Sequence, residues 1–168
     1  LASGLKQQFS EVQLISVTDQ LDKKAIEQAI QVADKVIIAV GEKSEEAGEA
    51  ASRAELKLKA IELELIDLLA TDEIEKILVT FSGRPLVLTD VVEKVDAIVS
   101  AWFLGSQTGD ALAMLLSGAE NFTAHLPMSF PRSVGQLPYS YQEMSTGRPQ
   151  TKENYHAVSY THLRAHET

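Results

Sequence analysis

The segment KVIIAVG, residues 35–41, decides the fold class of this chain. Its run of β-branched and other apolar residues, closed by a glycine, is typical of a strand buried on both faces of a parallel sheet. Two later runs repeat the pattern, KILVTFSG at 76–83 and DAIVSAWFLG at 96–105. Segments of helical period alternate with these runs. We therefore predict an α/β fold with a mostly parallel sheet flanked by helices.

Two segments, about 22–33 and 60–69, carry apolar residues at helical spacing and precede the strands predicted at 35 and 76. The apolar stripe of the first predicted helix consists of Ala25, Ile26, Ala29, Ile30 and Val32. A helical turn is expected near 90–95. A short helix is expected from Gly109 to about Leu116, capped by Thr108 and ended by Gly118.

The two ends of the chain give weaker patterns. VQLISV at 12–17 is typical of a first strand, whereas the chain from Asn121 onward is broken by proline and glycine. We interpret that region as an extended arm with one short strand near 128–130. A length of 168 residues and 45% apolar content are typical of one ordinary globular domain.

Charge and composition exclude several classes of partner and site. The formal charge of −9 disfavours nucleic acid and anionic membranes, because both would repel the chain. The absence of cysteine excludes disulfides, a thiolate nucleophile and zinc–sulfur sites, and leaves the redox compartment open. The first residues lack a signal-peptide pattern, and no apolar run approaches the roughly 20 residues of a membrane span. A missing initial Met suggests that the chain was cut from a longer one.

Loops that follow parallel strands meet at one edge of a sheet, where α/β proteins bind ligands. Three loops are expected at this rim. They are the acidic loop GEKSEEAGEAASR (residues 41–53), Ser82 to Arg84, and Gly105 to Thr108. The sequence therefore predicts the functional site at this rim.

The acidic loop raises the question of whether one of its carboxyl groups has a chemical role. Most acidic runs are solvated, and Glu42, Glu45 and Glu46 are interpreted in this way first. A proton donor needs a carboxyl group held apart from water or close to a second carboxylate, because either raises its pKa. Glu49 lies between Gly48 and Ala50, whose small size would let a ligand approach, so it is the best candidate.

For three other candidate site residues, structural roles are favoured over functional ones. Trp102 and Phe103 end an apolar strand, where core packing is favoured over a sugar-stacking surface. Arg84, between Gly and Pro, is predicted to form a buried ion pair or to fix loop carbonyl groups.

Three further kinds of site are disfavoured. Ser82 and Ser129 have no histidine at an interpretable spacing and no nucleophile-elbow motif. The glycines form no dinucleotide-binding pattern. His162 and His166 have the spacing of a two-histidine metal site, but no helix or carboxylate supports one. These patterns therefore predict neither a dinucleotide site nor a metal site.

Taken together, six motifs resemble the C-terminal α/β sandwich domain of glycoside hydrolase family 3, especially its bacterial periplasmic β-glucosidases. They are VIIAVGE, EAASRAELKL, FSGRPLVL, VDAIVSAWFLG, LPMSFPRSVGQLPYSY and TGRP, in that order between Val36 and Pro149. The resemblance implies that residues 1–150 are this domain, of the (α/β)6-sandwich type, truncated at its start and incomplete. Residues 151–168 are expected to be a disordered tail, which from about 158 resembles a translated sequencing adapter.

The resemblance implies a retaining glycosidase that removes terminal non-reducing β-D-glucosyl residues without a cofactor. A nucleophilic aspartate would come from an N-terminal (β/α)8 barrel of the same full-length protein, and the acid/base glutamate from this domain. By its place in EAASR, Glu49 matches the acid/base position, and Glu42 in VGE is the alternative. A periplasmic or secreted location is implied as well.

The chain also departs from the family pattern. Leu104 and Gln107 stand where relatives commonly have proline and glutamate, and no barrel is present. The isolated chain is therefore expected to be inactive, and its sugar and linkage specificity stay open. An alternative is a non-catalytic α/β binding or interaction module that kept the fold and lost the chemistry.

Overall fold

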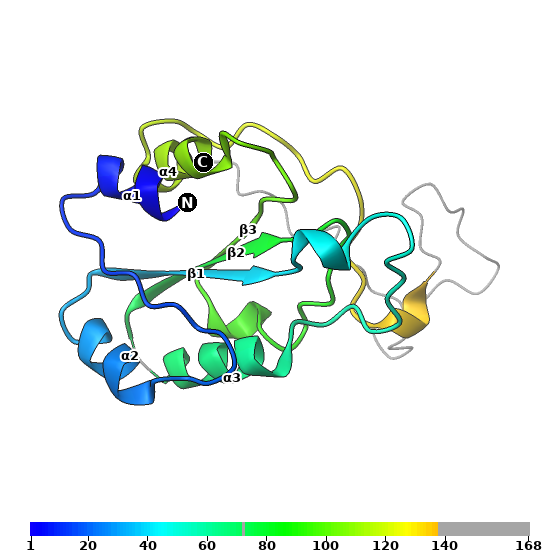
Figure 1. The fold of residues 1–168 in the computed structure, drawn as a ribbon, viewed down its shortest axis with the longest axis horizontal. Helices are drawn as coiled ribbons and strands as arrows, with labels where there is room; N and C mark the ends of the chain where they lie inside the picture. The colour runs from blue at the N-terminus through cyan, green and yellow to red at the C-terminus, as the bar shows by residue number, and fades with distance from the viewer. Residues whose placement is uncertain (72, 138–168) are drawn as a thin grey trace.

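The structure, a computed structural model, describes residues 1–71 and 73–137. Its centre is a three-stranded parallel sheet in the order β1-β2-β3, formed by Lys35–Gly41, Glu75–Phe81 and Ala97–Ser100 (Figure 1). In register, Ile38 pairs with Leu78, and Leu78 pairs with Ile98. The three predicted buried runs therefore form neighbouring parallel strands.

Helices cover both faces of the sheet (Figure 1). On one face lie α1 (Ala2–Gln8) and α4 (Thr108–Ser117), and on the other lie α2 (Lys23–Ile30) and α3 (Ala60–Leu69). Short 3-10 helices occur at Ser44–Glu46, Val92–Lys94 and Val134–Gln136. This layering confirms the predicted α/β sandwich. No helix in the described ranges is both long and apolar enough to cross a bilayer.

The larger apolar core lies between the sheet and the face covered by α2 and α3. Leu78 and Ile66 are completely buried there. Both helices begin at predicted positions. The Asp22 side chain accepts a hydrogen bond from the Ala25 amide, and Glu62 accepts one from the Lys59 amide. Helix α2 ends at Ile30 and not near 33, so the assignment of Val32 to its apolar stripe is wrong, and Val32 is 81% exposed.

The opposite face is held by a close contact between backbones. A Cβ atom placed on Gly4 of α1 would lie 2.4 Å from the Gly109 carbonyl oxygen of α4, so only glycine fits this crossing. Leu112 of α4 packs with Val79 of β2 in the core beneath. The sequence patterns did not predict α1, because its Ser3 and Gly4 are weak helix formers.

Two predicted strands are wrong. Residues 12–17 form no regular element, since no strand in the described part of the chain pairs with them. Ile15 nevertheless packs on the core, while Leu14 is 63% exposed. Residues 128–130 also form no strand, although Phe130 is buried against the core.

Two predicted boundaries also differ from the structure. The last strand ends at Ser100 and does not reach Gly105, because the backbone turns at Trp102, whose φ is 51°. Thr108 does not cap α4. Its hydroxyl donates to the Gly105 carbonyl oxygen, and the helix ends at Gly118 as predicted, in the left-handed conformation.

Several predictions concern residues outside the described ranges. The TGRP motif, the tail at 151–168, and the histidines at 162 and 166 all belong to this group. The proposed division into a domain at 1–150 and a tail therefore stays a prediction.

Candidate functional site

The acidic loop leaves the sheet at the carboxyl end of β1, at the rim predicted to carry the site (Figure 1). Gly41 ends the strand with φ of 131°, and the Glu42 amide then donates to the Phe81 carbonyl oxygen at 2.7 Å. Neighbouring loops meet here. A Cβ atom on Gly83 would lie 3.0 Å from the Ala47 Cβ and 3.4 Å from the Phe103 ring. The loops that follow β1, β2 and β3 are therefore adjacent, as predicted.

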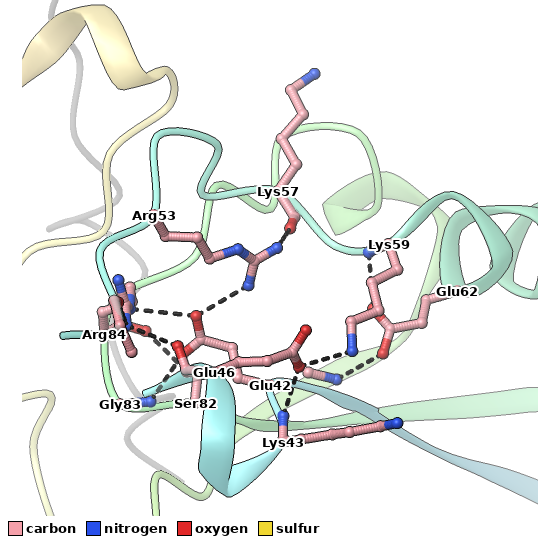
Figure 2. Close-up of polar contacts among 12 residues, drawn as sticks. Glu42, Lys43, Glu46, Arg53, Lys57, Lys59, Glu62, Ser82, Gly83 and Arg84 are labelled. Carbon is pink, nitrogen blue, oxygen red and sulfur yellow. Dashed lines mark hydrogen bonds and ion pairs between the residues drawn. The ribbon is translucent and has the colours of Figure 1, made fainter. Parts of the chain in front are cut away.

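Glu42 lies at the centre of this rim, and its interpretation as a solvated carboxylate is wrong. Its side chain is completely buried. One carboxylate oxygen, Oε1, accepts from Arg53 Nη1 at 2.9 Å and lies 3.2 Å from Arg84 Nε, while Oε2 accepts from the Gly83 amide at 3.0 Å (Figure 2). Two guanidinium groups and one amide therefore occupy both oxygens, which is how a buried charge is stabilised.

Arg84 connects this ion pair to the acidic loop. Its Nη2 donates to the Glu46 carbonyl oxygen at 3.0 Å and to the Ala51 carbonyl oxygen at 3.1 Å. The Ser82 hydroxyl donates to the Arg84 carbonyl oxygen at 2.7 Å, which fixes the backbone of Arg84 itself. The prediction that Arg84 forms a buried ion pair or fixes loop carbonyls is confirmed, because it does both.

A second set of contacts holds the first half of the loop. Glu46 Oε2 accepts from the Lys43 amide and from Lys59 Nζ, both at 2.7 Å (Figure 2). The backbone amide of Lys43 and then the Lys59 ammonium group lower the pKa of Glu46 from its ordinary value. The Ser44 hydroxyl donates to the neighbouring Glu45 carboxylate and lowers the pKa of Glu45. Both carboxylates therefore favour the charged form.

Glu49 lies on a turn at the exposed part of the loop. The Ala51 amide donates to the Gly48 carbonyl oxygen at 3.3 Å, which closes a four-residue turn around Glu49 and Ala50. Ala50 has φ of 61°, a conformation that costs a non-glycine residue energy and that often marks functional positions. The Glu49 side chain is exposed and forms no hydrogen bond or ion pair with the rest of the described chain.

The aromatic residues after β3 have different roles. Trp102 packs on Phe130, with ring centroids 6.0 Å apart, which confirms the core-packing interpretation for Trp102. For Phe103 that interpretation is wrong, because its side chain is 47% exposed at the rim.

The structure assigns no nucleophile or metal site in its described part. The Ser82 hydroxyl is engaged with a carbonyl group, and the Ser129 Oγ is buried with no hydrogen-bond partner among the described residues. Residues 1–71 and 73–137 contain no cluster of side chains that could hold a metal ion. An open cavity of about 360 Å³, lined by Glu27, Gln31 and Glu73 among others, lies at the amino end of β2, away from the acidic loop.

Sequence reasoning missed the part that Glu62 plays at this site. Besides capping α3, Glu62 accepts a hydrogen bond from the Gly41 amide at 2.8 Å, so that α3 is tied to the end of β1 (Figure 2). The glutamate at the third position of a helix was a readable capping signal, whereas its contact with β1 depends on tertiary packing.

The comparisons with known proteins agree on one family. A family described as "Glycosyl hydrolase family 3 C-terminal domain" matches residues 1–162. Over 126 residues the chain is 41% identical to the periplasmic β-glucosidase of Salmonella typhimurium, and this alignment covers 75% of this chain and 16% of that protein. Over 128 residues the chain is 35% identical to the β-xylosidase of Formosa agariphila, and this alignment covers 74% of this chain and 18% of that protein.

A solved structure shows the same fold. The β-glucosidase from Listeria innocua in complex with isofagomine aligns with a TM-score of 0.85 and 39% identity, and the alignment covers 91% of this chain and 22% of that one. The chain thus spans less than a quarter of the length of each of these three proteins.

Proposed function

This chain belongs to glycoside hydrolase family 3, whose C-terminal domain it matches over residues 1–162, and from that premise we propose that it supplies the proton donor of a β-glucosidase-like enzyme. Glu49 is the proposed acid/base for hydrolysis of terminal non-reducing β-D-glucosyl residues by the full-length protein. The observation that carries this assignment is the exposed, unpaired carboxylate of Glu49, presented at the rim by a turn with a left-handed residue.

The proposed chemistry has two steps. In the first, the Glu49 carboxyl group gives its proton to the glycosidic oxygen as the bond to the anomeric carbon breaks, and an aspartate nucleophile forms a glycosyl ester. In the second, the Glu49 carboxylate takes a proton from the water that attacks this ester, so that the sugar is released and both carboxyl groups are restored. The reaction needs no cofactor.

The nucleophile is proposed to come from an N-terminal (β/α)8 barrel of the same full-length protein. Retaining glycosidases place their two carboxyl groups about 5 Å apart, so the Glu49 turn must face the barrel's active site. The negative charge of this second carboxylate would disfavour a second negative charge beside it, so the donor would enter the reaction with its proton. The 168-residue chain alone is expected to hydrolyse nothing.

The geometry favours Glu49 over Glu42 as the proton donor. Both carboxylate oxygens of Glu42 are occupied, and its side chain is completely buried between Arg53 and Arg84. Moving Glu42 to a substrate would leave two partly buried guanidinium groups without their counter-ion, which is costly. Glu49 has no such bonds to break.

The names of the relatives support a proposed substrate and a proposed location. A β-linked glucoside is the proposed substrate, since the Salmonella and Listeria proteins are both named β-glucosidases. The periplasm is the proposed location, because the Salmonella relative is named a periplasmic enzyme.

The test is Glu49→Gln in the full-length protein. For β-glucosides with poor leaving groups, such as cellobiose, we expect kcat/KM to fall about 100-fold or more, because these reactions need proton donation. For 2,4-dinitrophenyl β-glucoside, whose leaving group needs no proton, kcat/KM should change little. Azide, which attacks the glycosyl ester without a general base, should restore turnover and form β-glucosyl azide.

Glu45→Gln is the matched control, since it removes one exposed charge from the same loop and should leave the kinetics unchanged. An equal loss on activated and poor leaving groups for Glu49→Gln would refute the assignment. A full-length protein that hydrolyses no glycoside from a panel of β-glucosides and β-xylosides would favour the non-catalytic module.

A further inference from the structure

The turn that carries Glu49 is held from both sides by one side-chain nitrogen. Arg84 Nη2 donates to the carbonyl oxygens of Glu46 and Ala51, which precede and follow Glu49 in the loop, at 3.0 and 3.1 Å. We call this pair of hydrogen bonds the Arg84 bridge. It fixes the separation of the two limbs of the loop on either side of Glu49.

The Arg84 bridge is in turn fixed to the sheet. Arg84 Nε lies 3.2 Å from Glu42 Oε1, and the amide of the preceding Gly83 donates to the other oxygen of the same carboxylate at 3.0 Å (Figure 2). Glu42 directly follows β1, and Gly83 follows β2 by two residues. The paired ends of β1 and β2 therefore determine where the guanidinium group of Arg84 lies.

Glu49 itself depends entirely on its backbone for its position. Its carboxylate makes no polar contact with the described chain, and its turn includes Gly48 and Ala50 with φ of 114° and 61°. A strained turn of this kind persists only where its surroundings fix it. The Arg84 bridge is the side-chain contact that spans this turn.

We propose that Arg84, anchored by Glu42, is the positioning residue for the proton donor Glu49. This inference rests on the proposed function of Glu49. Arg84 does not touch the substrate in this proposal. It holds the Glu49 backbone where the carboxyl group can reach the glycosidic oxygen, and a displacement of about 1 Å at such a group can cost on the order of 100-fold in rate.

The geometry requires arginine. The guanidinium group of Arg84 uses Nε for Glu42 and Nη2 for the two carbonyl oxygens, so that two nitrogens of one rigid plane serve three acceptors. The single ammonium group of lysine cannot reach all three acceptors in this arrangement. Arg84→Lys therefore keeps the charge that neutralises Glu42 and removes the bridge.

The experiment compares Arg84→Lys with two other variants in the full-length protein. For Arg84→Lys we expect kcat/KM on cellobiose to fall by roughly 10- to 100-fold, while kcat/KM on 2,4-dinitrophenyl β-glucoside, which reports only the formation of the glycosyl ester, falls less than threefold. Arg53→Lys should have a smaller effect, because Arg53 Nη2 binds the Lys57 carbonyl oxygen, outside the turn. Lys23→Gln breaks only an exposed ion pair between Lys23 of α2 and Glu64 of α3, so it should leave the kinetics on both substrates unchanged.

A second readout follows the turn directly. The Ala51 amide should exchange with solvent deuterium faster in Arg84→Lys, while the β2 amides exchange as in the unsubstituted protein. In Glu49→Gln/Arg84→Lys, the loss on cellobiose should equal that of Glu49→Gln alone, because a misplaced donor matters only where a donor exists.

Distinct results would overturn each idea. The positioning role of Arg84 is refuted if Arg84→Lys loses activity equally on both substrates, or if its kinetics and its Ala51 amide exchange are unchanged. In either case, a selective loss on cellobiose in Glu49→Gln still supports Glu49 as the proton donor. If Glu49→Gln shows no selective loss, the proposed function fails first. If Arg84→Lys does not fold, a crystal structure of the full-length protein with isofagomine tests the positioning role instead. Arg84 Nη2 beyond 3.5 Å from either carbonyl oxygen refutes the positioning role, and its presence between both, with Glu49 facing the ligand, supports it.

Discussion

The sheet and the acidic loop meet at Gly41, yet opposite kinds of interaction hold them. In the sheet, Leu78 and Val79 are completely buried, and apolar side chains fill both faces. In the loop, no residue between 43 and 53 belongs to the buried apolar core of the described chain. Ion pairs, together with hydrogen bonds to main-chain groups, hold the acidic loop in place. The difference separates stability, which apolar burial supplies, from placement, which directional polar contacts supply.

The largest expected effect lies in the sheet. Leu78→Ala in the purified chain should lower the free energy of unfolding by about 2–5 kcal/mol, because it leaves a cavity in a completely buried part of β2. Urea denaturation followed by circular dichroism measures this loss. Leu14→Ala is the control, since Leu14 is 63% exposed, and it should cost less than 0.5 kcal/mol by the usual range for surface sites. Equal losses in the two variants would contradict this account of the core.

The next effect lies at the junction of the two regions. A Cβ atom on Gly41 would lie 2.0 Å from the Phe81 carbonyl oxygen, and the φ of Gly41 is 131°. We expect Gly41→Ala to cost about 1–3 kcal/mol through overpacking and strain. Gly48→Ala shares the positive φ but meets no atom within 4 Å, so it isolates the conformational part of the cost. A Gly41→Ala variant no less stable than Gly48→Ala would show that the close contact does not matter.

A smaller effect, of opposite sign, is expected within the loop. Ala50→Gly should raise the free energy of unfolding by up to about 1 kcal/mol, because glycine adopts the φ of 61° with less strain. Ala51→Gly, whose φ is not positive, should instead lower it by about 0.5–1 kcal/mol through the entropy of the unfolded chain. Urea titrations of both variants check the two signs. A loss of stability in Ala50→Gly would contradict the strain at Ala50.

The smallest effect on the whole domain is the response of the loop to acid. The Lys43 amide and then the Lys59 ammonium group lower the pKa of Glu46 in the folded chain, so the stabilising contact of this carboxylate is present above the unfolded pKa and is lost as the pH falls through the folded pKa. The Lys43 amide, which donates to Glu46, should therefore lose protection from hydrogen exchange as the pH falls through that folded pKa, while β2 amides keep theirs. Glu46→Gln should abolish this pH step. Simultaneous loss of protection in β2 would mean that the loop and the sheet unfold as one unit.

Much of the fold could be predicted because its signals are local. The apolar runs at 35–41 and 76–83 and the cap at Asp22 each specify an element from their own neighbourhood. The failed strand at 12–17 has the composition of a strand, but strand formation needs a partner, and no partner is encoded in its own residues.

The candidate site was predictable in place but not in its contacts. The rule that loops after parallel strands converge located the rim, and the identity of Arg84 between Gly and Pro suggested its structural role. Nothing in the acidic loop, however, distinguished buried Glu42 from exposed Glu45. The burial of Glu42 depends on Arg53 at the other end of the loop, and on Gly83 and Arg84, which lie far along the chain and become neighbours of Glu42 only after the sheet has formed.

The Arg84 bridge has a consequence for how this loop can vary. Arg84 binds main-chain oxygens of Glu46 and Ala51 and no side chain between them. Residue identity at 47 is therefore nearly invisible to the contact that holds the turn, whereas a φ of 114° favours glycine at 48. A combinatorial library randomised at 47, with Glu42, Gly48, Glu49 and Arg84 kept, would place new side chains beside the proposed donor without changing the contact that holds its turn.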